Sequence, residues 1–162
     1  MSTETNKAIV RSYFERAVNQ NDMDWLDQII APQFGADHPV PGGATPTAAA
    51  AHHPTGPARA RAAIEHLRRA FPDIAYTVAD LLAEGERVVV QVTFRGTHRG
   101  VFLGVPATGR LVTGSGVELA VLAGGQIVAA GWQYHDELGL LRQLGVIADH
   151  GRGPHGGEHE PL

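Results

Sequence analysis

The sequence predicts an α+β domain in which helices cover one face of a curved antiparallel sheet. Apolar residues recur at helical spacing in the first part of the chain, and they alternate with polar residues in four later stretches. Helices followed by strands joined through turns are typical of α+β domains. Glycines inside the expected strands indicate bends or bulges; they are Gly96, Gly114, Gly116 and Gly131. We therefore expect the sheet to bend into a cone-shaped barrel with an internal pocket.

Helices are predicted over residues 5–20, over a shorter stretch that Asp22 caps and Pro32 ends, and from Pro57 to Phe71. The first carries one apolar stripe, made of Ile9, Val10, Tyr13, Phe14, Ala17 and Val18. Each helix therefore has one face that must be buried against another layer.

Between the second and third helices the chain is rich in proline and glycine, which predicts a long loop over residues 39–57 that could close over a site. Strands are expected at 74–83, 87–98 and 111–122, and after the Gly124-Gly125 turn. We expect one domain over residues 6–146. The tail, residues 147–162, lacks apolar content and is predicted to be disordered.

Composition and charge argue against several classes of function. The formal net charge is −4 without a basic run, which argues against a nucleic-acid partner. There is no cysteine, so no disulfide framework or thiolate chemistry is expected. No stretch resembles a signal peptide or a spanning helix, so we expect a cytoplasmic protein without a membrane partner.

The strand after Gly125 carries the strongest candidate for chemistry. Regular alternation places one set of side chains on a common face: Val128, Ala130, Trp132, Tyr134 and Asp136. The opposite face then holds Ile127, Ala129, Gly131, Gln133 and His135. A carboxylate beside aromatic groups is a candidate general acid/base, because apolar surroundings raise its pKa. Asp136 could equally be the N-cap of the helix that follows, since aspartate is a favoured cap.

Other polar residues offer weaker candidates. His98 is in phase with Val90, Val92 and Phe94, so it is either a core histidine or a proton shuttle in the pocket. His38 could lie at the pocket mouth. The tail histidines have no supporting ligand spacing, so neither a metal site nor a cofactor is expected. No phosphate loop or nucleophile elbow is present, which leaves acid–base chemistry or binding alone.

Several segments, taken in order, resemble the SnoaL-like polyketide cyclases of the nuclear-transport-factor-2-like superfamily. They cover most of residues 6–146 and read VRSYFERAVNQNDMDWLDQIIAPQF, AFPDI, EGERVVVQVTFRGTHRGVFLGVPATGR and GGQIVAAGWQYHDELGLLRQLG. Two departures are the turn Pro106-Ala107-Thr108-Gly109, where the family often has two prolines, and the long 39–57 segment.

The resemblance implies a cone-shaped α+β barrel and a cofactor-free, intramolecular aldol ring closure on a hydrophobic, polyketide-like ester in natural-product biosynthesis. It implies that Asp136 is the acid/base and that His98 lies near it in the pocket, with His38 a weaker match. Phe14, Trp132 and Tyr134 would supply apolar walls for the substrate. Family members are commonly homo-oligomers, so a dimer or tetramer is expected.

Two alternatives remain open. The same scaffold could run a hydrolysis, an isomerisation or another cyclising step, because a fold does not fix a function. It could also be a non-catalytic binding module. The second alternative predicts that Asp136 is an exposed helix cap and that His98 is buried and bonded to backbone.

Overall fold

One open sheet of four antiparallel strands, in the order β1-β2-β3-β4, organises the protein. The computed structural model describes residues 2–35 and 55–147. Its strands are β1 Ala75–Glu84, β2 Arg87–Thr97, β3 Leu111–Ala123 and β4 Gln126–His135. Its helices are α1 Thr3–Ser12, the π-helix η1 Tyr13–Val18, α2 Met23–Ile29, α3 Gly56–Ala70 and α4 Glu137–Leu144. The predicted α+β class is confirmed.

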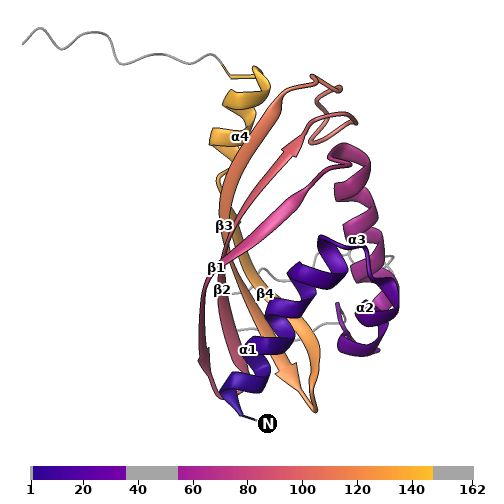
Figure 1. Ribbon diagram of the computed structural model, residues 1–162, viewed down its shortest axis with the longest axis vertical. Helices are drawn as coiled ribbons and strands as arrows, with labels where there is room; N and C mark the ends of the chain where they lie inside the picture. Colours follow the sequence, from indigo (N-terminus) through magenta and orange to yellow (C-terminus); the bar gives the residue numbers. More distant parts are fainter. Residues whose placement is uncertain (1, 36–54, 148–162) are drawn as a thin grey trace, which may run out of the picture.

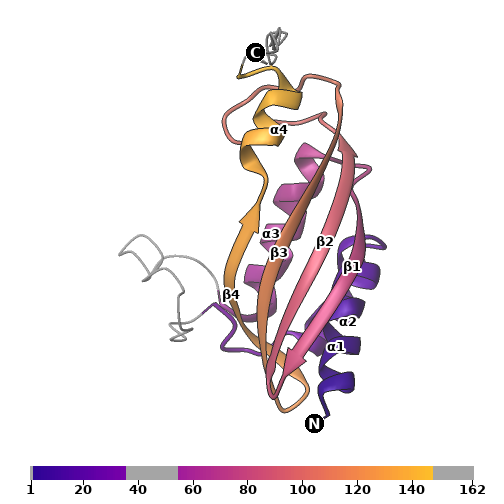
Figure 2. The ribbon, with the colours of Figure 1, turned by 90° about the vertical axis from the view of Figure 1, so that its left-hand side faces the viewer.

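Helices α1, α2 and α3 lie on one side of the sheet (Figure 1). In the view turned by 90° the strands stand in front, with α1, α2 and α3 behind them and α4 at the far end of β4 (Figure 2). The sheet is curved, but its order ends at β1 and β4, so the four strands form an open sheet and not a closed barrel. We call the face toward α1–α3 the inner face and the opposite one the outer face.

The core lies between the inner face and the helices. Val88, Val90 and Val92 of β2 are at most 1% exposed, and they belong to one cluster with Phe14 and Leu26. Burying one such side chain stabilises the fold by roughly 1.5–3 kcal/mol. A second cluster joins the end of α3 to β3 and α4 through residues such as Phe71, Val112 and Leu140. The period-2 pattern of β2 therefore predicted its buried face correctly.

The first helix differs from its prediction. It begins at Thr3, where Ser2 accepts a hydrogen bond from the Thr5 amide, and from Tyr13 onward it widens into a π-helix. The Asn19 amide bonds to the carbonyl of Phe14, five residues back, at 2.9 Å. Such wide turns recur at functional sites. Phe14, Ala17 and Val18 are buried in this wide turn, so the predicted apolar stripe is kept, although a pattern of period 3.6 cannot reveal the π-helix itself.

Most of the predicted loop at 39–57 and all but the start of the predicted tail lie outside the described residues, as does His38. Within the described ranges, no helix is long and apolar enough to span a bilayer.

Candidate functional site

A bulge in β4 decides which side chains face the helices. Glu118 of β3 pairs with Gln133, whereas Ala120 pairs with Ala130. One residue of β3 thus lies opposite two residues of β4, which is the arrangement of a β-bulge. Glu118 also pairs with the buried Val90 of β2, so Glu118 and Gln133 both belong to the inner face.

The bulge corrects the predicted faces of the last strand. Beyond it, Gln133 and His135 share the inner face with Ala130, and Tyr134 turns to the outer face, where it pairs with Val117. Gly131 lies in this bulge, as the glycine pattern suggested, but strict alternation across it separated Gln133 and His135 from Ala130, which shares their face. A second register shift, between Val121 and Leu122, leaves Ile127 on that face too, as alternation predicted. A single inserted residue inverts every side chain that follows.

Three polar side chains meet on the inner face around Glu118. Its Oε2 accepts a hydrogen bond from Nε2 of Gln133 at 3.1 Å, and its Oε1 lies 3.2 Å from Nε2 of His135. The Glu118 side chain is 16% exposed and that of His135 is 32% exposed. The hydrogen bond with Glu118 raises the pKa of His135, and partial burial opposes the shift. Gly116 faces His135 across the strands, and a Cβ there would overlap the imidazole.

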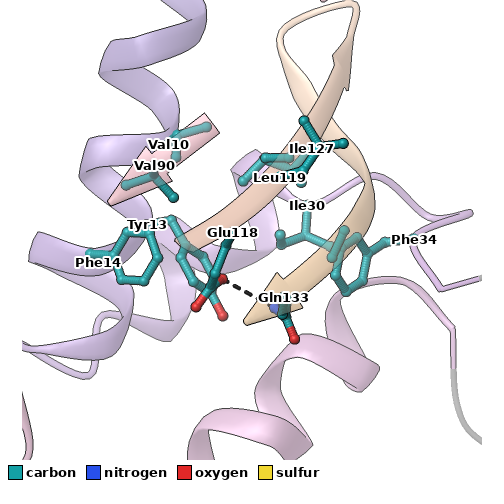
Figure 3. Close-up of a pocket in the computed structure, with 12 residues that line it drawn as sticks. Val10, Tyr13, Phe14, Ile30, Phe34, Val90, Glu118, Leu119, Ile127 and Gln133 are labelled. Carbon is teal, nitrogen blue, oxygen red and sulfur yellow. Dashed lines mark hydrogen bonds between the residues drawn. The ribbon is translucent and has the colours of Figure 1, made fainter. Parts of the chain in front are cut away.

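Glu118 and Gln133 line a pocket of about 60 Å³ between the sheet and the first two helices (Figure 3). The other lining residues are mostly apolar: Val10, Tyr13, Phe14, Ile30, Phe34, Val90, Leu119, Ala120, Ile127 and Ala130. A carboxylate in such a hollow has few competing water contacts. It can therefore act on a bound group as a base, or as an acid once protonated.

The π-helix places Tyr13 and Phe14 in the wall of this pocket. Burial, and after it the negative charge of Glu118, raises the pKa of Tyr13. Tyr76 of β1 lies behind them, with its ring 5.6 Å from that of Phe14. Asn19 fixes Tyr76 by bonding its backbone N–H and C=O, each at 2.8 Å. Phe14 is therefore where the sequence placed it, in a pocket wall, and its contact with substrate stays a prediction.

Asp136 lies on the other side of the sheet. It is an exposed residue at the N-cap of α4, where its Oδ1 accepts a hydrogen bond from the Gly139 amide at 2.8 Å. It borders an outer-face groove together with Thr93, Arg95 and Ser115. The cap that the sequence offered as an alternative is thus present.

His98 is buried on the inner side, at the far end of β2. Its ring lies 5.3 Å from that of Phe71, and its Nδ1 accepts a hydrogen bond from the Thr108 amide at 3.3 Å. This bond places the ring proton on Nε2, which has no hydrogen-bond partner among the described residues. His98 does not line the Glu118 pocket.

The structure does not bring Asp136 and His98 together. The expectation that they converge in one enclosed hollow is wrong, because Asp136, just beyond the end of β4, borders the outer-face groove, whereas His98 is buried on the inner side. Their individual catalytic roles stay predictions. Tyr134 is 70% exposed on the outer face, which separates it from the pocket wall. Trp132 lies in the bulge, and its predicted substrate contact also stays a prediction.

The family model of SnoaL-like polyketide cyclases matches residues 8–144. The chain belongs to the SnoaL-like polyketide cyclase family. Similar solved structures include TsrD from Streptomyces laurentii, at 28% identity and TM-score 0.73, with 91% of this chain and 99% of that chain covered. A candidate polyketide cyclase from Acidithiobacillus ferrooxidans has 26% identity and TM-score 0.70, with 91% and 100% covered.

IdmH from Streptomyces antibioticus, a candidate polyketide cyclase, is a further neighbour of this SnoaL-like protein. It has 26% identity and TM-score 0.64, with 86% of this chain and 98% of that chain covered. No curated protein sequence matches the chain. These neighbours confirm the cone-type fold that the resemblance implied.

Sequence reasoning missed Glu118, Gln133 and His135 in this SnoaL-like chain. One signal was available: Glu118 is the only charged residue between Leu111 and Ala123, and it is in phase with the inward Val112. A lone charge at a core position of a strand is expensive unless it is paired, so it marks a candidate site. In the described part of the chain, no three His, Cys, Asp or Glu side chains gather as a metal site would require.

Proposed function

We propose that this SnoaL-like protein closes a ring in a small polyketide-like ester by an intramolecular aldol reaction, with Glu118 as acid and base. The observation that carries the proposal is the Glu118 carboxylate in an apolar pocket, bonded to Gln133 and His135. A carbon between two carbonyl groups is acidic enough for a carboxylate to take its proton, so the chemistry needs no external electron acceptor.

The steps balance within the substrate and Glu118. The C–H bond of the activated carbon breaks, its proton moves to a Glu118 oxygen, and its electron pair enters the enolate. The enolate carbon then forms a C–C bond to a second carbonyl carbon of the same molecule. The new alkoxide takes the proton back from Glu118. Holding the two carbons in contact removes the entropic cost of bringing them together.

Gln133 and His135 have different parts in this scheme. Gln133 donates to one carboxylate oxygen and fixes the plane of Glu118. His135 contacts the other oxygen and is partly exposed, so it can exchange protons between Glu118 and solvent. His135 does not line the pocket, so it acts through Glu118 and is a positioning and relay residue.

The pocket volume limits what enters. A pocket for a drug-sized ligand usually measures on the order of 300–1,000 Å³. The pocket beside Glu118 measures about 60 Å³. We therefore propose that only the reacting dicarbonyl end of the substrate enters beside Glu118, and that the rest of the molecule extends past Gln133 toward the pocket mouth.

Product mass tests the reaction. The protein is incubated in D₂O with aromatic methyl esters that carry a 1,3-dicarbonyl side chain, and products are followed by mass spectrometry. Aldol closure leaves the mass of the substrate unchanged, apart from exchanged deuterium, or lowers it by one water after dehydration. Ester hydrolysis instead produces the free acid. Closure by the wild type that Glu118→Gln abolishes supports the proposal, and closure that survives in a folded Glu118→Gln protein refutes it.

A non-catalytic small-molecule-binding module is the second candidate. It is favoured by the exposed cap at Asp136 and by the bond between buried His98 and the Thr108 backbone. It predicts that the pocket binds an aromatic ester without exchanging its acidic protons. Deuterium exchange at the dicarbonyl carbon, followed by NMR with wild type and Glu118→Gln, separates the two candidates.

A further inference from the structure

We infer that the Tyr13 hydroxyl is the hydrogen-bond donor that stabilises the oxyanion formed when Glu118 removes a proton. The inference rests on the proposed function and adds a second reacting group to the same pocket. It also specifies the ligand: a planar, enolisable carbonyl, or a phenolate that resembles its enolate.

The geometry begins with the shared pocket. Tyr13 and Glu118 both line it, one from the π-helix and one from β3. In Figure 3 the Tyr13 ring and the Glu118 carboxylate point into the same part of the pocket. An oxygen and a carbon of one small substrate can therefore contact the two groups at once.

Tyr13 is held in place by its neighbours. Its ring meets that of Phe14 edge-on, with centroids 5.1 Å apart and planes at 87°. The π-helix fixes the backbone of both residues. A donor that is already oriented toward the developing charge lowers the barrier, because nothing has to rearrange during the reaction.

Tyr13 is suited to donate and unsuited to act as a base. Burial, followed by the charge of Glu118, raises the pKa of Tyr13, so the phenol holds its proton more tightly than a free tyrosine does. Among the described residues, no group is hydrogen-bonded to the Tyr13 hydroxyl. Gln133 and His135, by contrast, already bond to Glu118. The hydroxyl is thus the donor in the pocket wall that a substrate oxygen can engage.

In the proposed reaction Glu118 takes the proton and Tyr13 donates a hydrogen bond to the oxygen that becomes negative. The electron pair of the broken C–H bond shifts toward the carbonyl oxygen, which becomes the enolate oxygen and accepts a hydrogen bond from the Tyr13 O–H. The proton goes to Glu118. When the enolate carbon attacks the second carbonyl, the charge leaves this oxygen, and the Tyr13 bond weakens again. Such a bond is stronger in the transition state than in the ground state, which is the condition for faster turnover.

Tyr76 provides a matched control. It is also a phenol near Glu118, and burial, then that charge, raises its pKa. Its ring packs between those of Phe14 and Phe94, with centroids 5.6 Å and 5.5 Å away, and it does not line the pocket. Tyr76→Phe therefore removes a nearby hydroxyl without removing the proposed donor.

The first measurement is exchange of the acidic protons of ethyl 3-oxo-3-phenylpropanoate in D₂O. We expect Tyr13→Phe to lower kcat about 10- to 100-fold with KM nearly unchanged, somewhat below the loss typical of a dedicated oxyanion-hole donor. Tyr76→Phe should stay close to wild type. A Tyr13→Phe protein that keeps the wild-type kcat while Glu118→Gln is inactive overturns this inference alone. Full exchange by Glu118→Gln overturns the proposed function instead.

The second measurement does not depend on turnover. Glu118→Gln imitates the pocket after proton transfer, so it should bind 4-nitrophenol as the phenolate, with the oxygen end inward, and lower the pH at which the bound dye ionises. Adding Tyr13→Phe should reverse that shift and weaken binding about tenfold or more, whereas adding Tyr76→Phe should not. The inference is rejected if the dye ionises at the same pH in Glu118→Gln with and without Tyr13→Phe, or if none of these variants perturbs the dye.

Discussion

His135 and His98 both lie on the inner side of the sheet, but their environments differ. His98 is fully buried, packed against the tilted ring of Phe71 and bonded to the Thr108 amide. His135 is about one-third exposed and bonded to a carboxylate that lines a pocket. The same side chain is thus a packing element in one place and a titrating group in the other. What distinguishes them is access to solvent and a charged partner, and neither can be read from alternation along a strand.

The segment around His98 forms a structural joint. The Asp73 carboxylate accepts hydrogen bonds from the Thr97 amide and hydroxyl, each at 2.6 Å. The amides of Arg99 and Gly100 donate to the carbonyl of Ala70 at the end of α3. A Cβ at Gly100 would overlap the carbonyl of Arg69, so only glycine fits this approach. These contacts join the end of α3 to the end of β2. The hydrogen bonds of Glu118 to Gln133 and His135, by contrast, join only the two neighbouring strands β3 and β4.

The largest effect should separate the two carboxylates. Glu118→Gln should lower the rate of dicarbonyl proton exchange about 10²- to 10⁴-fold, because it removes the acid/base from the pocket. Asp136→Asn should keep most of the wild-type rate, since Asp136 borders the outer-face groove and asparagine caps a helix about as well. Initial rates by NMR, with circular dichroism as a check on folding, decide the matter. If Asp136→Asn loses the activity and Glu118→Gln keeps it, Asp136 is the acid/base and Glu118 is not.

His98→Ala should lower stability rather than chemistry. It opens a cavity under Phe71 and leaves the Thr108 amide without its acceptor, at a cost of about 2–3 kcal/mol in the free energy of unfolding. Urea denaturation measures the loss. The exchange rate per folded molecule should match wild type, because His98 does not line the Glu118 pocket. A stable His98→Ala protein without activity would instead support the predicted role of His98 in catalysis.

His135→Ala should show the converse pattern. We expect the exchange rate to fall about tenfold to a hundredfold, with free imidazole restoring part of it, because the relay between Glu118 and solvent is lost. Stability should change by less than about 1 kcal/mol, since the pair is partly exposed. A purely structural role for His135 would leave no rescue by imidazole.

The pH dependence of stability tests whether the hydrogen bond between His135 and Glu118 depends on the charge of His135. The pKa of His135 is raised in the folded protein, chiefly by its hydrogen bond to Glu118. The bond therefore contributes stability below the ordinary histidine pKa of about 6.5, and this contribution is lost as the pH rises through the raised value. Compared with His135→Gln, the wild type should lose more stability between about pH 6 and pH 9. Parallel curves for the two proteins would show that the bond is not coupled to ionisation.

The sequence predicted those parts of the fold that depend on periodicity. Val88, Val90 and Val92 recur at every second position, and the strand they predict is present with that face buried. The site could not be predicted in the same way, because two local irregularities build it. The bulge at Gly131 brings Gln133 to the same face as Ala130, and the π-helix from Tyr13 onward replaces regular α-helix. Each adds one residue to a regular strand or helix. The free-energy cost of that extra residue depends on contacts with residues distant in the sequence, so a local pattern cannot predict it.

The smallest predicted effect tests whether Asp136 is more than a cap. Asp136→Ala removes the acceptor for the Gly139 amide at the start of α4 and should cost about 1 kcal/mol in the free energy of unfolding. Asp136→Asn keeps an acceptor oxygen and should stay within about 0.5 kcal/mol of wild type. Thermal and urea denaturation of both variants, alongside their exchange rates, separate stability from chemistry. If both variants lose the same activity while only the alanine loses stability, the Asp136 charge matters for turnover, and the outer-face groove with Arg95 and Thr93 becomes the site to pursue.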